Sequence, residues 1–334
     1  AVKMAADLLL RAEHPFIVAG GGVLVSGAWA ELTQVAEILG APAGTSINGK
    51  GAIAEDHPLS AGAVGSNGRR PYANELLQAA DLILYVGCKT GSVTTFGWTV
   101  PHPASGQTIV HVDVDPAEIG RNYPTAVGLV GDAKLALADL AKELGGRGVT
   151  PRRSALADIG DKVAEFWRHF ETRATSSSTP IKPQRVIRAL ARHLPDDSVV
   201  VADAGTPTPF TVAYLRTAAG RRTIIPRGYG GLGYAIPGVV GAKLAKPEAT
   251  VVGLVGDGSF GMTANNLATA VEEELPVIVV VLNNRMLGMV AQWQRFFYDK
   301  RYSAVKLKGN PDFVKLAEAY GAEGVRVETI DDFR

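Results

Sequence analysis

The sequence contains two short polar clusters, each of which directly follows a run of apolar residues. Residues 250–255 end in the GDG of positions 256–258, and residues 276–282 end in the NN of positions 283–284. Asp257 supplies a carboxylate and Asn284 an amide oxygen, and the glycines beside Asp257 allow a ligand to approach the backbone closely. Mg²⁺ prefers oxygen ligands of this kind together with phosphate oxygens. We therefore predict that Asp257 and Asn284 hold a divalent cation that bridges the protein to an anionic ligand.

The two apolar runs predict strands that are buried on both faces, because a continuous apolar run bounded by turn residues leaves no face for water. Residues 263–273 between them predict a helix, and strand, helix, strand is a parallel crossover unit. Both polar clusters then lie at the carboxyl edge of one parallel sheet, where such folds bind ligands. Ser259 and the residues after it open a helix whose free N–H groups favour an anion. The alternative is a pair of ordinary turns, in which Gly, Asp and Asn are common.

The spacing of GDG at 256–258 and NN at 283–284 resembles the signature of enzymes that depend on thiamine diphosphate (ThDP). The string LGMVAQWQRFFYDKRYS at 287–303 is further similar to the catalytic subunit of acetohydroxyacid synthase, also called acetolactate synthase. The resemblance covers nearly the whole chain, which would form the central and the diphosphate-binding domains of such an enzyme. It implies that Mg²⁺ is held by Asp257, Asn284 and the backbone carbonyl of Met286.

The resemblance also implies how the cofactor and the substrates are held. Leu232 would lie under the thiazolium ring and prop the cofactor in a bent form, with an ordinary core leucine as the alternative. Met289 and Val290 would lie beside the ring and Trp293 would line the pocket of a second 2-oxo acid, with an amphipathic core stripe as the alternative. These four residues are the expected catalytic set. The expected cofactor-binding residues are Gly205, Thr206, Leu232, Gly256, Asp257, Gly258, Ser259 and Asn284.

A second glycine-rich string, residues 228–233, matches the GxGxxG pattern of dinucleotide-binding sites. A lone match of this pattern is weak evidence. Pro237 and Gly238 lie in the helix that would have to follow, and no acidic residue ends a strand about 20 residues further on. The dinucleotide interpretation is therefore kept only as an alternative to the ThDP interpretation.

Two segments depart from the pattern of the synthases. The synthases usually carry Gln-His after the equivalent of Gly205, where this chain has Thr206 and Pro207. They also carry Asp-Asp-Arg after the strand that matches residues 82–86, where this chain reads CKTGSVTT and Lys89 is the only cation. In the family that Arg faces the substrate carboxylate, so its replacement leaves the identity of the substrate open.

Composition limits the class of protein and its partners. The 334 residues are 46% hydrophobic and 20% charged, as in an ordinary soluble globular protein. A formal net charge of +1 gives no reason to expect a nucleic-acid partner. No apolar run approaches the roughly 20 residues of a membrane-spanning helix, and the single cysteine, Cys88, suits a reducing compartment. We therefore expect a cytoplasmic protein without nucleic-acid or membrane partners.

Alternating strand and helix patterns predict an α/β protein of two doubly wound parallel-sheet domains. Residues 1–146 would form a Rossmann-like central domain, residues 147–183 a linker with one surface helix at 154–172, and residues 184–334 the domain that binds the ThDP diphosphate and Mg²⁺. The last strand is expected at residues 324–327. The N-terminal pyrimidine-binding domain of the family has no counterpart in these residues, and the chain stops soon after the last strand. We therefore expect an incomplete chain that is inactive alone.

These patterns converge on a ThDP- and Mg²⁺-dependent lyase or transferase that decarboxylates a 2-oxo acid, pyruvate, and joins the product to a second 2-oxo acid. Such an acetolactate synthase-like enzyme would serve branched-chain amino acid biosynthesis as a homodimer or homotetramer, with a regulatory subunit as an expected partner. Residues 112–116 match the flavin-side strand of the family, which keeps FAD as a candidate cofactor. Two alternatives stay open: another ThDP-dependent 2-oxo acid decarboxylase or acyl-CoA lyase, and a non-catalytic nucleotide-binding module.

Overall fold

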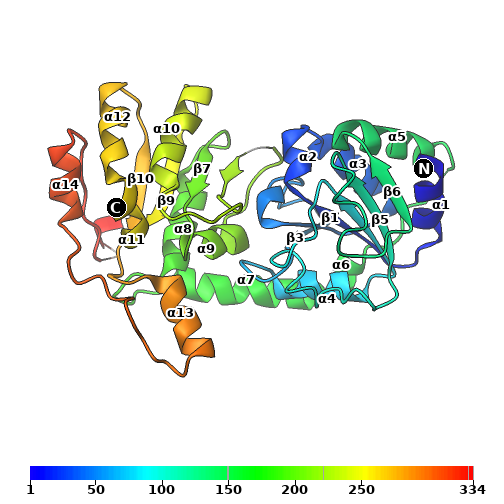
Figure 1. Cartoon of the computed structure of the whole chain (residues 1–334), viewed down its shortest axis with the longest axis horizontal. Helices are drawn as coiled ribbons and strands as arrows, with labels where there is room; N and C mark the ends of the chain where they lie inside the picture. The colour runs from blue at the N-terminus through cyan, green and yellow to red at the C-terminus, as the bar shows by residue number, and fades with distance from the viewer. Residues whose placement is uncertain (149, 221, 330, 334) are drawn as a thin grey trace. The chain divides into compact units, whose positions relative to one another are not determined.

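The structure is a computed structural model that describes residues 1–148, 150–220, 222–329 and 331–333 (Figure 1). The chain divides into two compact units. The first unit contains residues 1–169 and 216–221, and the second contains residues 170–215 and 222–334. The boundary near residue 169 falls inside the segment 147–183, which the sequence predicts as a linker.

A six-stranded parallel sheet with the strand order β3-β2-β1-β4-β5-β6 forms the centre of the first unit. Its strands are β1 (Pro15–Ala19), β2 (Ala43–Thr45), β3 (Ser60–Ala63), β4 (Leu82–Val86), β5 (Thr108–Asp113) and β6 (Val127–Val130). β1 and β4 pair along their full length, and all of their residues are buried because both faces of the sheet are covered. This order, in which the chain changes direction beside β1, is that of a doubly wound sheet.

Two apolar clusters cover the two faces of this sheet (Figure 1). One face packs against α1 (Val2–Arg11), α2 (Gly21–Val25), α3 (Trp29–Leu39) and α5 (Ala133–Gly145). The other packs against α4 (Pro71–Ala79), α6 (Ala155–Asp158) and the start of α7 (Gly160–Ala174), and a 3₁₀ turn, η1 (Ile47–Gly49), follows β2. Asp132 caps α5, because its carboxylate accepts hydrogen bonds from the N–H groups of Lys134 and Leu135.

The second unit contains a four-stranded parallel sheet with the order β10-β9-β7-β8. Its strands are β7 (Val199–Ala202), β8 (Thr223–Ile224), β9 (Val251–Gly256) and β10 (Ile278–Leu282). One face packs against α10 (Ala235–Ala245), α11 (Asp257–Thr263), α12 (Leu267–Glu272) and α14 (Phe313–Ala319), and the other against α8 (Pro183–His193) and α9 (Pro207–Tyr214). The remaining elements are η2 (Ala264–Asn266), α13 (Gly288–Phe297) and η3 (Asp331–Phe333).

The predicted fold class is confirmed, since both units are parallel α/β sheets with helices on both faces. The strand at 82–86 has the predicted bounds. The crossover between residues 250 and 282 is also present, because β9 and β10 pair in parallel. Within the described ranges, no helix is both long and apolar enough to cross a membrane.

β10 differs from its prediction as a strand buried on both faces. It is an edge strand of the described sheet, and Ile278 is 52% exposed. A pocket of about 750 Å³ lies beside it, lined by β10, α12, α14 and residues 321–328. An apolar run indicates a hydrophobic strand, but it does not indicate whether a neighbouring strand covers the outer edge of that strand.

Two predicted helices are interrupted in the structure. The helix predicted at 263–273 is divided into the end of α11, η2 and α12, and the side-chain amide of Asn266 donates to the carbonyl of Thr263 at 3.1 Å. An asparagine side chain that bonds the nearby backbone competes with helical hydrogen bonding, which accounts for the break. The surface helix predicted at 154–172 is likewise two helices, since α6 ends at Asp158 and α7 begins at Gly160.

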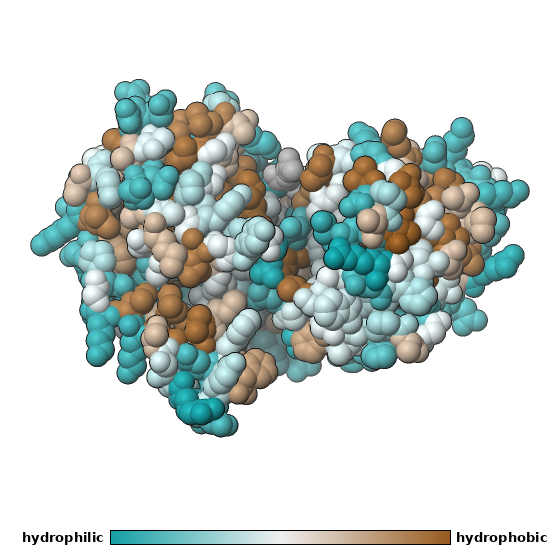
Figure 2. Space-filling view, viewed as in Figure 1, coloured by the Kyte–Doolittle hydropathy of each residue, from teal (hydrophilic) through white to brown (hydrophobic). Residues whose placement is uncertain are grey.

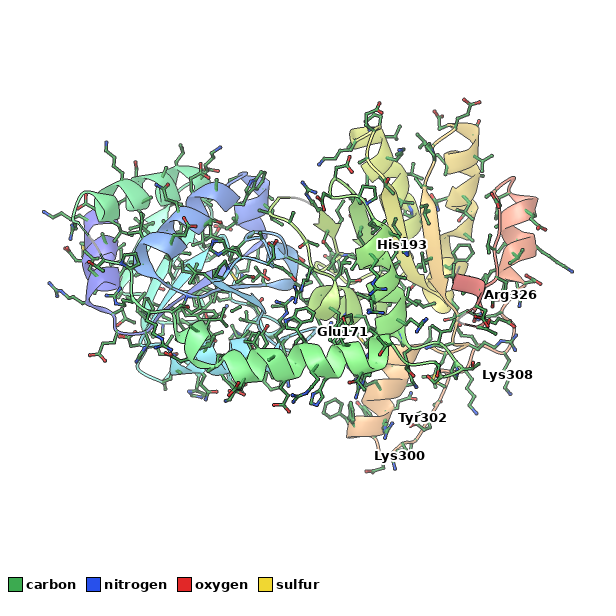
Figure 3. The ribbon with its side chains drawn as sticks, turned by 180° about the vertical axis from the view of Figure 1, so that it is seen from behind. Glu171, His193, Lys300, Tyr302, Lys308 and Arg326 are labelled. Atoms are coloured by element: carbon green, nitrogen blue, oxygen red, sulfur yellow. The ribbon has the colours of Figure 1, made fainter. Side chains whose placement is uncertain are left out.

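The prediction of a strand at residues 324–327 is wrong, because these residues do not form a strand in the structure. The guanidinium of Arg326 instead pairs with Asp312 at 2.8 Å and with Glu328 at 3.4 Å, close to α14 (Figure 3). Val325 is 73% exposed. The alternating apolar pattern of this segment favours a strand locally, but a strand also needs a partner edge at the right place.

Candidate cofactor site at the strand ends of the second unit

The ends of β9 and β10 bring the two polar clusters together. Leu282 at the end of β10 is paired with Gly256 at the end of β9, so Asp257 and Asn283 follow directly paired residues. Asn284 lies one residue further along the same turn. Both clusters therefore sit at the carboxyl edge of one parallel sheet, which is the ligand-binding edge of α/β folds.

Asp257 is a buried carboxylate held by neutral donors. It is 2% exposed, its Oδ1 accepts a hydrogen bond from the N–H of Gly258 at 3.0 Å, and its Oδ2 accepts one from Nδ2 of Asn310 at 2.8 Å. The same Nδ2 donates to Oδ1 of Asn283 at 3.2 Å. A buried carboxylate needs such donors, because burial removes it from water. Asn310 was missed by the sequence analysis, since an Asn-Pro pair signals only a turn and nothing in its spacing connects it to Asp257.

The turn that carries Asn284 is held by its own side chain and by a second segment. Oδ1 of Asn284 accepts a hydrogen bond from the N–H of Met286 at 3.0 Å. The N–H of Leu287 donates to the carbonyl of Val305 at 2.8 Å, and Met286 forms an antiparallel bridge in the segment 305–307. The amide oxygen of Asn284 and the carbonyl of Met286, two of the predicted ligands, therefore belong to one braced turn.

Asp203 holds the end of β7 to the glycine-rich loop. It is fully buried, its Oδ1 accepts from the N–H of Gly233 at 3.1 Å, and its Oδ2 accepts from the N–H of Ala235 at 2.8 Å. Burial raises the pKa of Asp203, and the hydrogen bonds from the backbone and from the Ser259 hydroxyl oppose this rise. Nothing in the local sequence pattern predicts these bonds, because Gly233 and Ala235 lie about thirty positions away from Asp203.

Leu232 lies next to Gly205, because Asp203 holds the backbone that follows Leu232 close to the end of β7. Gly205 has a φ of +90°, which glycine adopts without strain, and a Cβ at this position would lie 3.8 Å from Cδ2 of Leu232. Leu232 is half-buried and is not part of the apolar cores of the unit. The structure thus brings the predicted Leu232 to the loop that follows β7, and the alternative of a core leucine does not hold.

Glycines around the strand ends differ in the space beside them. Four of these glycines have open space beside them, because an added Cβ would have no protein atom within 4 Å: Gly228, Gly230, Gly231 and Gly256. Gly258 is different, because a Cβ there would lie 2.6 Å from Cδ2 of Leu287. The open space expected on both sides of Asp257 therefore exists at Gly256, whereas at Gly258 the end of the Leu287 side chain fills it.

Thr206 and Asn284 meet at Gly288, the first residue of α13. A Cβ on Gly288 would lie 3.0 Å from Cγ2 of Thr206 and 3.3 Å from Nδ2 of Asn284. The absence of a side chain at Gly288 thus lets the loop after β7 and the turn after β10 approach one another. The predicted residues from both loops are gathered at one place.

α13 carries the remaining predicted residues on a mostly exposed surface. Val290 is 44% exposed, Trp293 is 59% exposed and Met289 is half-buried, whereas only Ala291 of this helix is buried. Figure 2 shows hydrophobic side chains on this part of the surface, and Tyr302 beyond the helix is also exposed (Figure 3). The alternative of an amphipathic core stripe does not hold for Val290 and Trp293.

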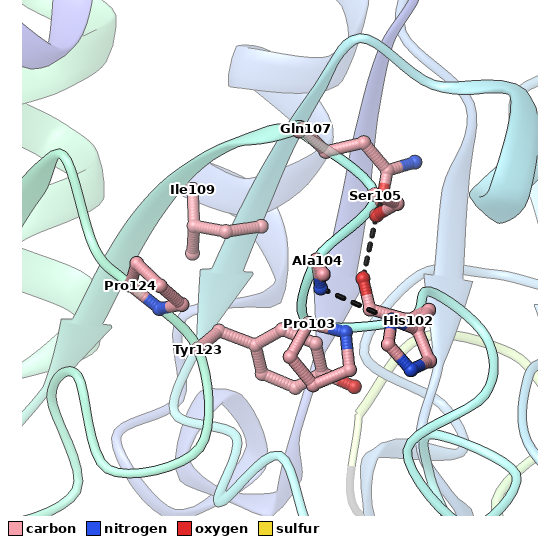
Figure 4. A pocket seen from close by; sticks show the side chains of 9 residues that line it. His102, Pro103, Ala104, Ser105, Gln107, Ile109, Tyr123 and Pro124 are labelled. Atoms are coloured by element: carbon pink, nitrogen blue, oxygen red, sulfur yellow. Dashed lines mark hydrogen bonds between the residues drawn. The ribbon is translucent and has the colours of Figure 1, made fainter.

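A smaller pocket in the first unit does not lie at the carboxyl edge of the sheet. It has a volume of about 230 Å³ and is lined by residues 102–107 with Ile109, Tyr123 and Pro124 (Figure 4). The Tyr123 hydroxyl donates to the carbonyl of Pro101 at 3.0 Å, and burial raises the pKa of Tyr123. These residues precede or begin β5 and β6, so the pocket lies at the amino edge of the sheet, opposite the edge that binds ligands in such folds.

The donor set at the strand ends suits a hard cation bound together with an anion. Among the described residues, no three His, Cys, Asp or Glu side chains gather to hold a metal. A cation beside Asp257 would therefore depend on amide and carbonyl oxygens and on oxygens of its ligand, which is the way Mg²⁺ is bound with phosphates. The open space at Gly256 leaves room for such a ligand. Parallel strand ends with a buried carboxylate beside open glycine loops are an arrangement that suits an anionic cofactor bound together with a cation.

Comparison with known families agrees with this class of site. A family model described as "Thiamine pyrophosphate enzyme, central domain" matches residues 2–140, and one described as "Thiamine pyrophosphate enzyme, C-terminal TPP binding domain" matches residues 203–334. The chain belongs to the thiamine pyrophosphate enzyme family. The second match contains all of the site residues described above.

Individual relatives are acetolactate synthases. The chain is 36% identical to a probable acetolactate synthase large subunit of Methanococcus aeolicus, over 98% of this chain and 56% of that protein. It is 37% identical to the corresponding protein of Methanocaldococcus jannaschii, over 100% of this chain and 56% of that protein. It is 35% identical to the acetolactate synthase isozyme 3 large subunit of Escherichia coli, over 98% of this chain and 56% of that protein. The chain thus spans a little over half the length of these relatives.

Proposed function

We propose that the second unit binds the diphosphate group of ThDP through Mg²⁺, which would be held by the carboxylate of Asp257, the amide oxygen of Asn284 and the carbonyl of Met286. The observation that carries this proposal is the buried Asp257 at paired strand ends, held by amide donors and flanked by open space at Gly256. The match of residues 203–334 to a TPP-binding domain supports it. Oxygen ligands from few protein groups, completed by phosphate oxygens, are what Mg²⁺ prefers.

The other residues of the site would orient the cofactor. The loops at Gly205 and Thr206 and at Gly256 to Ser259 would receive the diphosphate, while Leu232 would support the thiazolium ring. Asp203 would keep Leu232 in place, because its carboxylate holds the backbone on the C-terminal side of Leu232. When bound, ThDP supplies the electron sink for breaking the bond next to a carbonyl. The chain itself would bind and orient the cofactor, and the half-buried Leu232 would support its ring.

We propose acetolactate synthesis as the activity of the protein that contains this chain. The names of the relatives support acetolactate synthesis. In this proposal, pyruvate is decarboxylated and joined to a second 2-oxo acid, and Met289, Val290 and Trp293 of α13 would lie beside the reaction. Their designation as large subunits supports a regulatory small subunit as a partner, and we extend the proposal to a homo-oligomer. Lys89 in place of the substrate-facing Arg keeps another ThDP-dependent decarboxylase or acyl-CoA lyase as the second candidate. FAD is left outside the proposal.

Calorimetric titration of ThDP with and without Mg²⁺ tests the site. Asp257→Ala removes the only carboxylate of the proposed ligand set, so we expect metal-dependent ThDP affinity to fall about 100-fold or more, which corresponds to about 2.7 kcal/mol. Asp139→Ala is the matched control, because Asp139 is an exposed carboxylate on α5. Unchanged affinity in a folded Asp257→Ala variant would contradict the assignment.

The substrate is tested separately in the protein that carries this chain. Formation of acetolactate from pyruvate in the presence of ThDP and Mg²⁺ is the expected result. Acetaldehyde or an acyl-CoA cleavage product in its place would favour the second candidate, while leaving the metal and diphosphate site intact.

A further inference from the structure

Asn310 connects the ends of two strands through one nitrogen atom. Its Nδ2 donates to Oδ2 of Asp257, which follows β9, at 2.8 Å, and to Oδ1 of Asn283, which follows β10, at 3.2 Å. A side-chain amide nitrogen carries two hydrogens, so both are used in these two bonds. Asn310 thereby sets the position of the Asp257 carboxylate relative to the turn that begins at Asn283.

The segment that carries Asn310 is held on both sides of this residue. Before it, the N–H of Leu307 donates to the carbonyl of Arg285 at 2.9 Å. After it, Asp312 caps α14, and the ring of Phe313 packs edge-on against Phe260 of α11 with the centroids 5.2 Å apart. The position of Asn310 is therefore determined by packing outside the two strand ends that it joins.

The chemistry of the donor matters as much as its position. A Lys or Arg at this place would neutralise the carboxylate and compete with a metal ion for it. Among the residues that the structure describes, no cationic side chain forms an ion pair with Asp257. A neutral amide orients the carboxylate and leaves its negative charge available. Each carboxylate oxygen has more than one acceptor position, so a lone pair also remains on each.

We propose that Asn310 is a positioning residue that aims the Asp257 carboxylate and the Asn283–Asn284 turn at a shared divalent cation. This inference rests on the proposed function of the site. Without Asn310, Oδ2 of Asp257 would lose the amide donor that orients it, and the carboxylate would turn toward other N–H groups. Residues that hydrogen-bond a metal ligand typically change metal affinity about 10- to 100-fold when they are removed.

The experiment measures metal and cofactor affinity separately in the 334-residue chain. Mn²⁺ serves as the probe of the metal site by electron paramagnetic resonance at saturating ThDP, and calorimetry gives ThDP affinity at saturating Mg²⁺. We expect Asn310→Ala to weaken Mn²⁺ binding about 10-fold or more, and saturating Mg²⁺ to restore most of the ThDP affinity. Asn265→Ala is the matched control, since Asn265 is an exposed asparagine of the same unit, and it should change neither quantity.

A second variant covers the case in which Asn310→Ala does not fold. Asn283→Ala removes the other acceptor from an exposed position but leaves the bond to Asp257 in place, so we expect a smaller loss of Mn²⁺ affinity in a stable protein. Unchanged Mn²⁺ affinity in the folded variants, or a loss of ThDP affinity that saturating Mg²⁺ does not restore, would overturn the positioning role. If the unsubstituted chain binds ThDP without any dependence on metal, the proposed function fails instead. The two failures are therefore distinguishable.

Discussion

The glycine-rich strand ends of the two units use the same residue type in opposite ways. In the first unit, a Cβ on Gly20 after β1 would lie 2.0 Å from the carbonyl oxygen of Gly87, and one on Gly22 would lie 2.7 Å from Cα of Gly87. In the second unit, a Cβ on Gly256 at the end of β9 would meet nothing within 4 Å. Gly20 and Gly22 allow the backbone of the first unit to pack against itself, whereas Gly256 in the second unit leaves space that a ligand can enter.

Buried charges show the same contrast. In the first unit, the buried Glu55 is paired with Lys50 and with Arg70, whose Nη2 lies 2.5 Å from Oε2. In the second unit, the buried Asp203 and Asp257 accept hydrogen bonds from neutral N–H groups and, for Asp203, from the Ser259 hydroxyl. Cations of the protein compensate the first carboxylate, while the negative charge at the second edge remains available. Under the proposed function, the second edge would use this charge to bind a cation and its ligand.

Substituting Gly20 has the largest expected effect. Gly20→Ala places a Cβ against rigid backbone, so we expect the free energy of unfolding to fall by about 3 kcal/mol or more. Gly91→Ala is the matched control in the same unit, because a Cβ there would meet nothing within 4 Å, and its effect should stay within about 0.5 kcal/mol. Urea unfolding measures both variants. Similar stabilities for the two would mean that Gly20 and Gly87 are not tightly packed.

Asp203→Asn tests the buried carboxylate that holds the glycine-rich loop. Replacing one acceptor oxygen with an amide leaves a backbone N–H without its partner, so we expect a loss of about 1–3 kcal/mol in the free energy of unfolding. Thermal and urea unfolding at neutral pH measure this loss. A variant as stable as the original chain would show that the bonds to Gly233 and Ala235 contribute little.

The raised pKa of Asp203 also predicts a pH dependence. Because the folded carboxyl binds its proton more tightly than the unfolded one, protonation favours the fold, and this contribution is greatest below the ordinary value of 3.8. It is lost as the pH rises from that value through the raised pKa of the folded state. The difference in stability between the original chain and Asp203→Asn should change across this window. A constant difference would contradict the direction of the pKa shift.

Gly256→Ala tests the open edge directly. The free energy of unfolding should change by no more than about 0.5 kcal/mol, because the new methyl group meets no protein atom. ThDP affinity in the presence of Mg²⁺ should fall about 10-fold, or 1.4 kcal/mol, because the methyl group occupies space beside the cofactor. Gly131→Ala, which also adds a methyl group in open space but in the first unit, is the control. Equal ThDP affinity in both variants would show that the space at Gly256 is not used.

Trp293→Leu has the smallest expected effect on stability. Since Trp293 is 59% exposed, we expect a change within about 0.5 kcal/mol. In the protein that carries this chain, the variant should alter the preference between pyruvate and 2-oxobutyrate as acceptor and spare the decarboxylation step. A product ratio that does not change would remove Trp293 from the acceptor pocket.

The sequence by itself determined the fold class, the crossover and the chemistry of the strand ends. Continuous apolar runs that end just before Asp257 and Asn283 indicate strands and their last residues, because both signals are local in the chain. Parallel pairing then forces the two ends to the same edge of the sheet. The resemblance to ThDP enzymes gave roles to Asp257 and Asn284, which the local pattern had already selected, and it alone pointed to Leu232 and to the residues of α13.

Only the tertiary structure decided which polar atoms hold these residues and which glycines leave space. Asn310 lies 53 positions from Asp257, and Asp203 lies 30 and 32 positions from its partners, so no local periodicity connects them. The same applies to β10, which is an edge strand despite its apolar run, and to residues 324–327, which have a strand-like pattern but no strand. Whether a glycine faces backbone or open space, and whether a strand has a neighbour, depends on segments that folding brings together. Sequence patterns report the preferences of each segment, while contacts between distant segments decide which preferences are realised.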